Sequence, residues 1–383
     1  MARRSVALLI ETSNAYARGL LEGIVNYLRE HPGWSVWLPE QERGAAPPAW
    51  LARWRGDGII ARIETAELAR AVLKLGVPVV DVSAARHVPG IPWVETDDAA
   101  VSRLAFEHLY ERGFRTLGFC GDDRFNWSRW RREHFVRLAE AADCQCFVFP
   151  GSLRNSPRFS WKRERARLMD WVLQLPKPAG LMACYDLQAQ DVLEACREQE
   201  IAVPDDVAVI GVDNDEVRCS LADPPLSSVI PDTLRTGYAA AHLLDRRMAG
   251  EQVPADACLI PPRGIATRRS TDVLAIDDPD LIKAWRFIRE QACHGIDVQH
   301  VLKEVPLSRR ALETRFLKVV GRTPHAEIMR LRIERVQTLL QETELSLVAI
   351  ARATGFRHVE YLSVAFKRQV GLTPREFRRR HSH

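Results

Sequence analysis

Several features that mark common classes of protein are missing from this sequence. No apolar run approaches the roughly 20 residues that a membrane-spanning helix needs. The apolar run before Glu11 has only five residues, fewer than the ~7–15 in the core of a signal peptide. The eight cysteines follow no repeated spacing, and the pair at Cys144 and Cys146 has no second pair or nearby histidines to complete a zinc site. We therefore expect a cytoplasmic protein with reduced thiols, no membrane association, no metal and no cofactor.

The short motifs of several enzyme classes are missing as well. No expected strand is followed by G-x-G-x-x-G, and the sequence contains no G-x-x-x-x-G-K loop and no G-x-S-x-G elbow. These absences argue against dinucleotide-dependent, P-loop and α/β-hydrolase enzymes. They favour a protein that binds its ligands without converting them.

Charge, in contrast, is plentiful and unevenly distributed. Residues 281–383 contain 20 Lys and Arg against 10 Asp and Glu, whereas the rest of the chain contains 34 against 40. A basic C-terminal part joined to an acidic partner predicts that only the former binds nucleic acid.

The C-terminal part contains a pattern that repeats after fifty residues. The matched positions, each followed by its partner, are Leu312 and Leu362, Phe316 and Phe366, Lys318 and Arg368, Val320 and Val370, Gly321 and Gly371, Thr323 and Thr373, Pro324 and Pro374. Apolar residues four apart give a helix one buried stripe, and Thr-Pro is a helix-start signal. With Gly355 placed where the chain turns sharply, the repeat predicts two helix-turn-helix units joined by a helix over about 324–341.

One of these units resembles a known family. The segment from Leu345 to Arg380 is similar to the signature of the AraC family of bacterial transcription regulators, through Ile350-Ala351, Gly355-Phe356, Tyr361-Leu362, Phe366-Lys367, Gly371 and Thr373-Pro374-Phe377. The resemblance covers residues 281–383. It implies a module whose two reading helices enter successive major grooves of double-stranded promoter DNA.

Side chains outside the buried stripes are the candidates for DNA contact. We expect contacts to base edges from Arg310, Glu313 and Thr314 on the first reading helix and from His358, Glu360, Tyr361 and Ser363 on the second. We expect contacts to phosphates from Arg309, Lys318, Arg357, Lys367 and Arg368.

The first 268 residues alternate short β runs with amphipathic helices. Strands are expected at 6–10, 34–38, 58–63, 77–82, 116–120, 146–149, 180–183 and 207–212, and helices at 16–28, 66–75, 98–112, 129–142, 161–175, 187–200 and 233–248. The alternation predicts an α/β fold with doubly wound parallel sheets, and the length favours two lobes. The polar residues 269–280 are expected to connect this domain to an all-α domain at 281–383.

This part resembles the type I periplasmic-binding-protein-like core of LacI-type repressors. The likeness lies in residues 94–121 and 203–215, with a shorter match at 11–24. A LacI-like sensor followed by an AraC-type module is similar to the bacterial xylose-operon regulators. The resemblance implies a homodimeric activator of a pentose-catabolism operon, with D-xylose as monosaccharide effector and RNA polymerase as partner.

A ligand site is expected beyond the carboxyl ends of the parallel strands. The candidates there are Tyr16, Asp97, Trp127, Arg131, Asp186, Asp213 and Asn214. Carboxylates, arginine and aromatic rings suit a sugar, since charged groups bond hydroxyls strongly and rings cover its C–H face. By resemblance, Arg131 and Asp213 correspond to sugar-binding residues of the family.

Alternatives stay open for three aspartates and for the function of the protein. Asp98 is expected to cap a helix while Asp97 serves the ligand, and Asp186 fits a cap and a ligand contact equally well. Asp186 and Asp213 also resemble the paired carboxylates of a carbohydrate-modifying enzyme. DNA-alkyl repair enzymes carry AraC-type modules, but no cysteine here has their Pro-Cys-His-Arg context.

Overall fold

The computed structural model describes residues 3–40, 45–150, 160–254, 257–273, 275, 278–343 and 345–381. Its described residues form two compact units. The first unit comprises residues 1–110 and 115–272, and the second comprises 273–383 together with 111–114. The boundary at 272/273 lies within the expected connection 269–280, whose start, Arg269–Thr271, forms the short helix η2 on the first unit.

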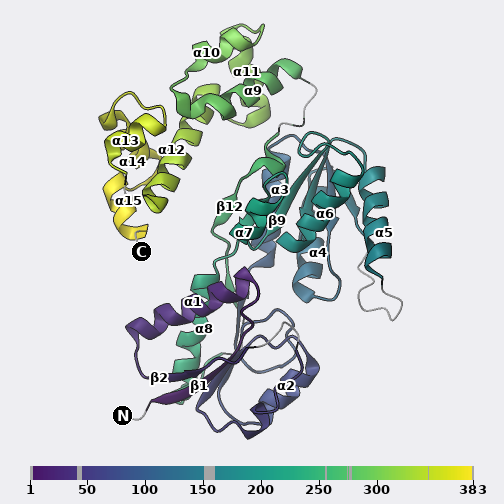
Figure 1. Ribbon diagram of the computed structural model, residues 1–383, viewed down its shortest axis with the longest axis vertical. Coiled ribbons are helices and arrows are strands. Elements are labelled where there is room, and N and C mark those ends of the chain that lie inside the picture. The colour runs from purple at the N-terminus through teal and green to yellow at the C-terminus, as the bar shows by residue number, and fades with distance from the viewer. Residues whose placement is uncertain are drawn as a thin grey trace. The chain divides into compact units, whose positions relative to one another are not determined.

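The first unit contains two six-stranded sheets, each in its own lobe (Figure 1). Lobe 1 has the strand order β11-β5-β4-β3-β1-β2, and every pairing in it is parallel. Its elements are β1 (Arg4–Leu9), α1 (Ala15–Glu30), β2 (Trp34–Trp37), η1 (Leu51–Arg53), β3 (Gly58–Ala61), α2 (Ala66–Leu73), β4 (Val79–Asp81), β5 (Trp93–Thr96), α8 (Thr233–Met248) and β11 (Ala257–Ile260).

Lobe 2 has the strand order β12-β10-β9-β8-β6-β7, with β12 alone antiparallel to its neighbour. Its elements are α3 (Asp98–Tyr110), β6 (Thr116–Cys120), α4 (Asn126–Ala141), β7 (Gln145–Val148), α5 (Trp161–Gln174), β8 (Ala179–Ala183), α6 (Asp186–Glu198), β9 (Val207–Val212), α7 (Glu216–Leu221), β10 (Ser227–Ile230), β12 (Gly264–Ala266) and η2. The predicted two-lobed, doubly wound parallel fold is thus confirmed.

The strands of lobe 1 are buried on both faces, which explains their nearly continuous apolar sequences. In β1, Val6 and Leu8 pack under α1 and α8, whereas Ala7 and Leu9 pack against η1 and α2. Helices α1 and α8 approach each other closely because glycines lie at their contact. A Cβ atom on Gly23 would lie 2.1 Å from the carbonyl oxygen of Leu234.

The chain crosses between the lobes three times, after β5, after β10 and after β11. The sequence patterns missed β5, β10, β11 and β12. These strands have three or four residues each, but β2 and β4 are no longer and were predicted, so length alone does not explain the omission. The crossings place the carboxyl ends of both sheets' strands around one space, where the expected ligand site lies.

The second unit is entirely helical in its described residues, as predicted. Its elements are α9 (Pro279–Gln291), η3 (Ala292–His294), α10 (Val298–Glu304), α11 (Arg309–Val320), α12 (Pro324–Glu342), α13 (Leu347–Ala353), α14 (Val359–Val370) and α15 (Pro374–His381). Helix α12 serves two apolar cores. Ile328 packs with Leu312 and Phe316, whereas Val336 packs with Leu362 and Phe366.

The turn and cap residues of this unit also behave as the repeat predicted. Gly321 and Gly371 end α11 and α14 in the left-handed conformation, with φ of 74° and 81°. Gly355 has a φ of +73°, and a Cβ on it would lie 2.6 Å from the backbone nitrogen of Gly295. Thr323 caps α12 by accepting a hydrogen bond from the backbone of Ala326. Position 355 therefore requires glycine, because its φ is positive and the backbone of Gly295 leaves no room for a Cβ.

Among the described residues, no helix combines the length and apolarity that crossing a bilayer requires. All eight cysteines are free thiols, and burial raises the pKa of Cys146 to about 12. No cluster of three or more metal-ligating side chains occurs within the described ranges.

Candidate functional site

A polar pocket lies between the two lobes, at the carboxyl ends of their strands. Its volume is about 820 Å³ with its open mouth included. Its lining comes from both lobes and consists of Asn14, Ala15, Tyr16, Arg62, Val82, Ala84, Glu95, Thr96, Asp98, Trp127, Arg131, Tyr185, Asp186, Leu187, Asp213, Asp215 and Arg218. A ligand in this pocket would therefore touch both lobes at once.

Five of the seven predicted ligand residues line this pocket. They are Tyr16 from lobe 1 and Trp127, Arg131, Asp186 and Asp213 from lobe 2. The rule that ligands lie beyond the carboxyl ends of strands selected them correctly as neighbours. Their contact with a sugar remains a prediction.

Arg131 occupies the lobe 2 wall of the pocket in a buried ion pair. Its Nε donates to Asp98 Oδ1 over 2.7 Å, and its Nη1 donates to the carbonyl oxygen of Cys184 over 2.6 Å. The two paired side chains are only 5% and 7% exposed. Burial raises the pKa of Asp98, and the Arg131 charge opposes that rise. The pair fixes a guanidinium at the pocket wall.

Asp186 is a buried carboxylate at the first turn of α6. Its Oδ1 accepts a hydrogen bond from Ser228 Oγ over 2.6 Å, and its Oδ2 accepts one from the backbone of Asp215 over 2.8 Å. It makes no capping bond, since the N-cap position is Tyr185 and no side chain caps this helix. The structure thus excludes the capping role, and a contact between Asp186 and a ligand stays a prediction. Burial, followed by the nearby charge of Asp213, raises the pKa of Asp186 to about 7.

Asp213 and Asn214 form a strained turn after β9. Their φ values of 105° and 47° are positive, which is costly for residues other than glycine. The turn directs the two side chains to different places. Asp213 lines the pocket, whereas Asn214 Oδ1 accepts a hydrogen bond from Arg268 Nη2 over 2.9 Å. The prediction that Asn214 lines the site is therefore corrected.

The structure also exchanges the expected roles of Asp97 and Asp98. Asp97 Oδ1 accepts from the backbone of Ala100 over 2.9 Å, which is the capping bond of α3. Asp98, one residue later, lies on the buried face of the helix and lines the pocket. The reason is helical periodicity. Asp98 shares its face with buried Val101 and Ser102, three and four residues on.

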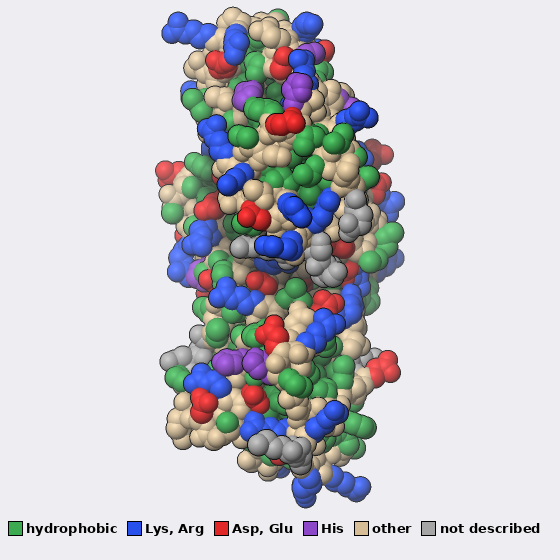
Figure 2. All heavy atoms as spheres, turned by 90° about the vertical axis from the view of Figure 1, so that its left-hand side faces the viewer, with side chains coloured by type: hydrophobic (Ala, Val, Ile, Leu, Met, Phe, Trp, Pro, Cys, Tyr) green, Lys and Arg blue, Asp and Glu red, His purple; other side chains and the backbone are tan. Residues whose placement is uncertain are grey.

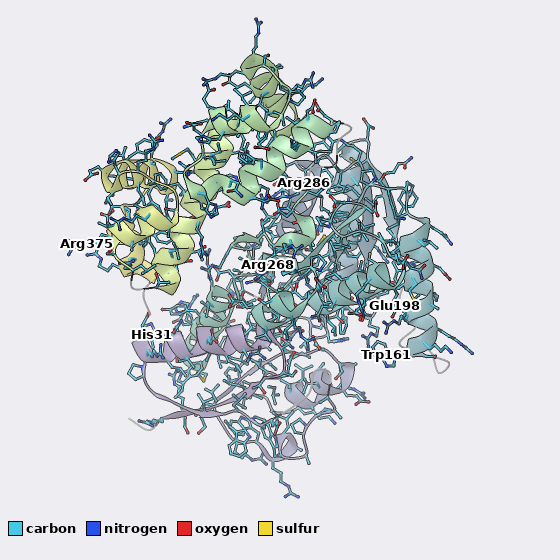
Figure 3. The ribbon with its side chains drawn as sticks, turned by 45° about the horizontal axis from the view of Figure 1, so that its top comes forward. His31, Trp161, Glu198, Arg268, Arg286 and Arg375 are labelled. Atoms are coloured by element: carbon cyan, nitrogen blue, oxygen red, sulfur yellow. The ribbon has the colours of Figure 1, made fainter. Side chains whose placement is uncertain are left out.

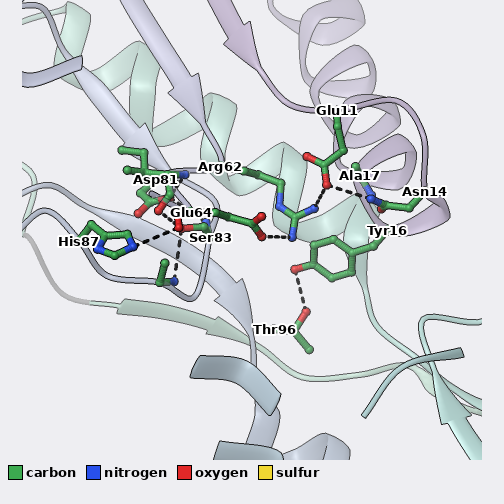
Figure 4. A network of polar contacts seen from close by, with 12 residues as sticks. Glu11, Asn14, Tyr16, Ala17, Arg62, Glu64, Asp81, Ser83, His87 and Thr96 are labelled. Carbon is green, nitrogen blue, oxygen red and sulfur yellow. Dashed lines mark hydrogen bonds and ion pairs between the residues drawn. The ribbon is translucent and has the colours of Figure 1, made fainter. Parts of the chain in front are cut away.

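Lobe 1 contributes a network centred on Arg62, which Figure 4 shows from close by. Arg62 forms ion pairs with Glu64, at 2.9 Å, and with Glu11. Asn14 Nδ2 donates to Glu11 over 2.8 Å. Burial alone would lower the pKa of Arg62, but the charges of Glu64 and Glu11 outweigh it and raise the pKa above its usual value. The network holds a cation at the lobe 1 wall.

Aromatic rings complete the lining. The Tyr16 hydroxyl lies 3.1 Å from Thr96 Oγ1, and the Arg62 guanidinium lies 5.3 Å from the Tyr16 ring centre. The Trp127 and Tyr185 rings meet edge to face, with their centres 5.6 Å apart, and the Arg131 guanidinium lies 4.8 Å from the centre of the Trp127 ring. Rings held beside carboxylates and guanidinium groups are the combination that recognises a polyhydroxylated ring.

Several pocket residues escaped the sequence analysis. Arg62 lay inside the expected strand 58–63, whereas β3 ends at Ala61, and Glu95 lies in β5, which the sequence patterns missed. Asp98 was identifiable from the helical spacing of its buried neighbours. Arg218 lies on the short helix α7, which no sequence pattern predicted.

The second unit presents two helices in the manner of a groove-reading module. In α14, Leu362 and Phe366 are fully buried, while Tyr361 and Val364 are 51% and 66% exposed. In α11, the buried stripe is again Leu312 and Phe316. Each helix therefore packs by one face and leaves the opposite one open to a partner.

The predicted DNA-contacting residues are largely at the surface of these helices. Ten are exposed: Arg309, Arg310, Thr314, Lys318, Arg357, His358, Glu360, Tyr361, Lys367 and Arg368. Glu313 and Ser363 are half-buried, and Glu313 accepts a hydrogen bond from Arg309 Nε over 2.9 Å. The sequence analysis missed exposed Val364, whose methyl groups suit contact with thymine.

On the face drawn in Figure 2, Lys and Arg side chains are spread among acidic, histidine and hydrophobic ones. Exposed Arg375 on α15 is labelled in Figure 3.

Comparisons with known proteins agree with this geometry. Residues 5–99 match the model of a XylR N-terminal domain, residues 106–271 that of a periplasmic binding protein-like domain, and residues 301–380 that of a helix-turn-helix domain. The xylose operon regulatory protein of Escherichia coli K12 is 34% identical, over 98% of this chain and 97% of its own length. Its counterpart in Haemophilus influenzae is 32% identical, over 97% of both chains.

A solved structure of the xylose-binding transcription activator XylR covers 100% of both chains, with 33% identity and a TM-score of 0.65. These relatives are regulators, and they favour a transcription regulator over the enzyme alternatives. The chain belongs to the family of xylose operon regulatory proteins.

Proposed function

We propose that this protein is a D-xylose-responsive transcription activator of a pentose-catabolism operon. It acts in the cytoplasm as a homodimer, contacts promoter DNA through α11 and α14 of each chain, and recruits RNA polymerase. The observation that carries the proposal is the pocket between the lobes. Its lining combines five carboxylates, three guanidinium groups and three aromatic rings.

The pocket suits a neutral polyol better than an ion. Asp98, Asp186 and Asp213 offer acceptors for hydroxyl protons, while Arg131 and Arg62 offer donors for hydroxyl oxygens. Each hydrogen bond to such a charged group is worth roughly 1.5–3 kcal/mol. The apolar C–H face of the ring would rest on Trp127, next to Arg131.

Binding at this place explains a response of the whole unit. The lining comes from both lobes, and in the described part of the chain three crossings join them. A sugar that bonds both walls stabilises the closed arrangement of the lobes. The closed arrangement then favours one geometry of the DNA-contacting helices in the dimer, as the two helix-turn-helix units require matched half-sites.

Calorimetric titration of the full chain with D-xylose, L-arabinose, D-ribose and D-glucose tests the proposal. We expect D-xylose to bind most tightly and to be recovered unchanged from the mixture. Absent heat for all four sugars would contradict the sugar-sensing role, and equal affinities for all four would contradict the preference for D-xylose. Chemical conversion of the sugar would contradict the regulatory one.

A further inference from the structure

The segment that leaves the first unit is fixed to lobe 2 by hydrogen bonds. The backbone N–H of Ser270 donates to the carbonyl oxygen of Pro225 over 2.9 Å, and the Ser270 hydroxyl donates to the carbonyl oxygen of Val209 over 2.6 Å. Thr271 Oγ1 lies 2.7 Å from Ser227 Oγ and 2.8 Å from His108 Nε2. The side chains of Ser227, Ser270 and Thr271 are fully buried. The two residues that follow are Asp272 and Val273, between which the units divide.

Arg268 connects this exit segment to the turn beside the pocket. Its Nη2 donates to Asn214 Oδ1 over 2.9 Å, and its Nη1 donates to the carbonyl oxygen of Leu226 over 2.8 Å. Its backbone N–H donates to Ser227 Oγ over 2.7 Å. Arg268, labelled in Figure 3, is half-buried. Because of these hydrogen bonds, it holds the exit segment against the 213–214 turn.

The same turn is tied to the pocket from its other side. The backbone N–H of Asn214 donates to Ser228 Oγ over 3.0 Å, and Ser228 Oγ donates to Asp186 Oδ1 over 2.6 Å. Asp213, the preceding residue, lines the pocket itself. Both turn residues have positive φ, so the turn is held in place by these contacts rather than by its own preference.

We infer that Arg268 is a positioning residue that transmits the occupancy of the pocket to the exit segment through Asn214. A ligand hydroxyl bonded to Asp186 or Asp213 shifts the 213–214 turn, because hydrogen bonds tie the turn both to the pocket, through Ser228, and to Arg268. The shift moves the acceptor of Arg268 and, with it, the backbone of 268–271. The inference rests on the proposed function, because it presupposes that a sugar occupies the pocket.

The test measures coupling in the full chain. A duplex enriched by this protein from a random-sequence pool is titrated by fluorescence anisotropy, with and without saturating D-xylose, at fixed salt. The ratio of the two Kd values is the coupling factor. Calorimetry gives the D-xylose affinity of each variant separately, so that loss of binding is not mistaken for loss of coupling.

Two variants break the contact from opposite sides, and one serves as matched control. Arg268→Gln removes the guanidinium, while Asn214→Gly removes its acceptor and tolerates the φ of 47° at that position. Arg269→Gln changes the adjacent arginine, which is exposed. We expect each of the first two to reduce the coupling factor by about 2- to 30-fold while D-xylose still binds. The double variant should lose no more than the larger single loss, and Arg269→Gln should behave as the unsubstituted chain.

Full coupling in Arg268→Gln would overturn the inference, and so would additive losses in the double variant or an equal loss in Arg269→Gln. Should Arg268→Gln fail to fold, Asn214→Gly alone decides by the same criterion. Failure of the proposed function is seen separately, as a coupling factor of one in the unsubstituted chain, and it would remove both claims.

Discussion

Replacing Arg131 by glutamine is the substitution that bears most directly on the pocket. The side chain is 5% exposed and pairs with Asp98, itself 7% exposed. Removing one partner of such a buried pair leaves the other charge uncompensated, at a cost of about 3–5 kcal/mol. Because burial already raises the pKa of Asp98, its carboxyl takes up a proton in the variant, which reduces that cost.

The effect on the sugar is separate from the effect on folding. A hydrogen bond from the guanidinium to a ligand hydroxyl is worth roughly 1.5–3 kcal/mol, so its loss weakens D-xylose binding about 10- to 150-fold. The control is Arg132→Gln, one residue away. Arg132 pairs with Asp123 at 2.7 Å, but the two side chains are 31% and 42% exposed. Such a surface pair contributes ~0–1 kcal/mol.

Calorimetry with D-xylose and thermal unfolding of both variants provide the assay. We expect Arg131→Gln to lose both affinity and melting temperature, and Arg132→Gln to lose neither. Equal D-xylose affinities for Arg131→Gln and the unsubstituted chain would refute the assignment of this side chain to the sugar site, even if its melting temperature fell.

Three further predictions concern stability and DNA. Burial raises the pKa of Asp81 to about 7, above its value in the unfolded chain, so the contribution of Asp81 to stability is present in full at low pH and is lost as pH rises through about 7. Asp81→Asn should flatten this pH dependence of the free energy of unfolding, measured with urea between about pH 4 and 8. An unchanged curve would exclude Asp81 as the source of the dependence. Gly355→Ala should destabilise the second unit more than Gly371→Ala. Both glycines have positive φ, but of the two only Gly355 has backbone atoms where a Cβ would lie, with Gly295 N at 2.6 Å. We expect ~1–2 kcal/mol of strain for both variants and ~1–3 kcal/mol more for Gly355→Ala, and equal losses of stability in denaturant titrations would contradict this. Lys367→Ala should lower the slope of log Kd against log salt by ~1 and leave base preference unchanged, while a changed preference in a selection from random duplexes would move Lys367 to the base-reading set.

The fold was accessible from the sequence wherever the elements are long enough to show a period. Helices α1 and α8 and the strands β1 and β9 were predicted within two residues at each end, because buried strands and amphipathic helices leave clear patterns. The short strands β5 and β12 left no such pattern, although β2 and β4, which are no longer, were predicted. Their place is set by neighbouring strands, which the local sequence does not encode.

The candidate site was accessible in part for a related reason. The rule about strand ends finds the right edge of the sheet but not the direction of each side chain. Asp213 and Asn214 are adjacent, yet their unusual φ values turn one toward the pocket and the other toward Arg268. Asp97 and Asp98 are likewise adjacent, and only the helical face decides which one is buried. In both pairs, the backbone geometry was needed to decide which of the two adjacent residues lines the pocket.

The central claim is that sugar in the pocket between the lobes changes how the helix-turn-helix unit holds DNA. The most direct measurement is the Kd of the full chain for a duplex it has itself enriched and for a scrambled duplex, each with and without D-xylose at one salt concentration. We predict a change of ~5- to 150-fold in affinity for the enriched duplex on adding D-xylose, and little change for the scrambled one. Equal affinities for both duplexes, unaltered by the sugar, would contradict the claim.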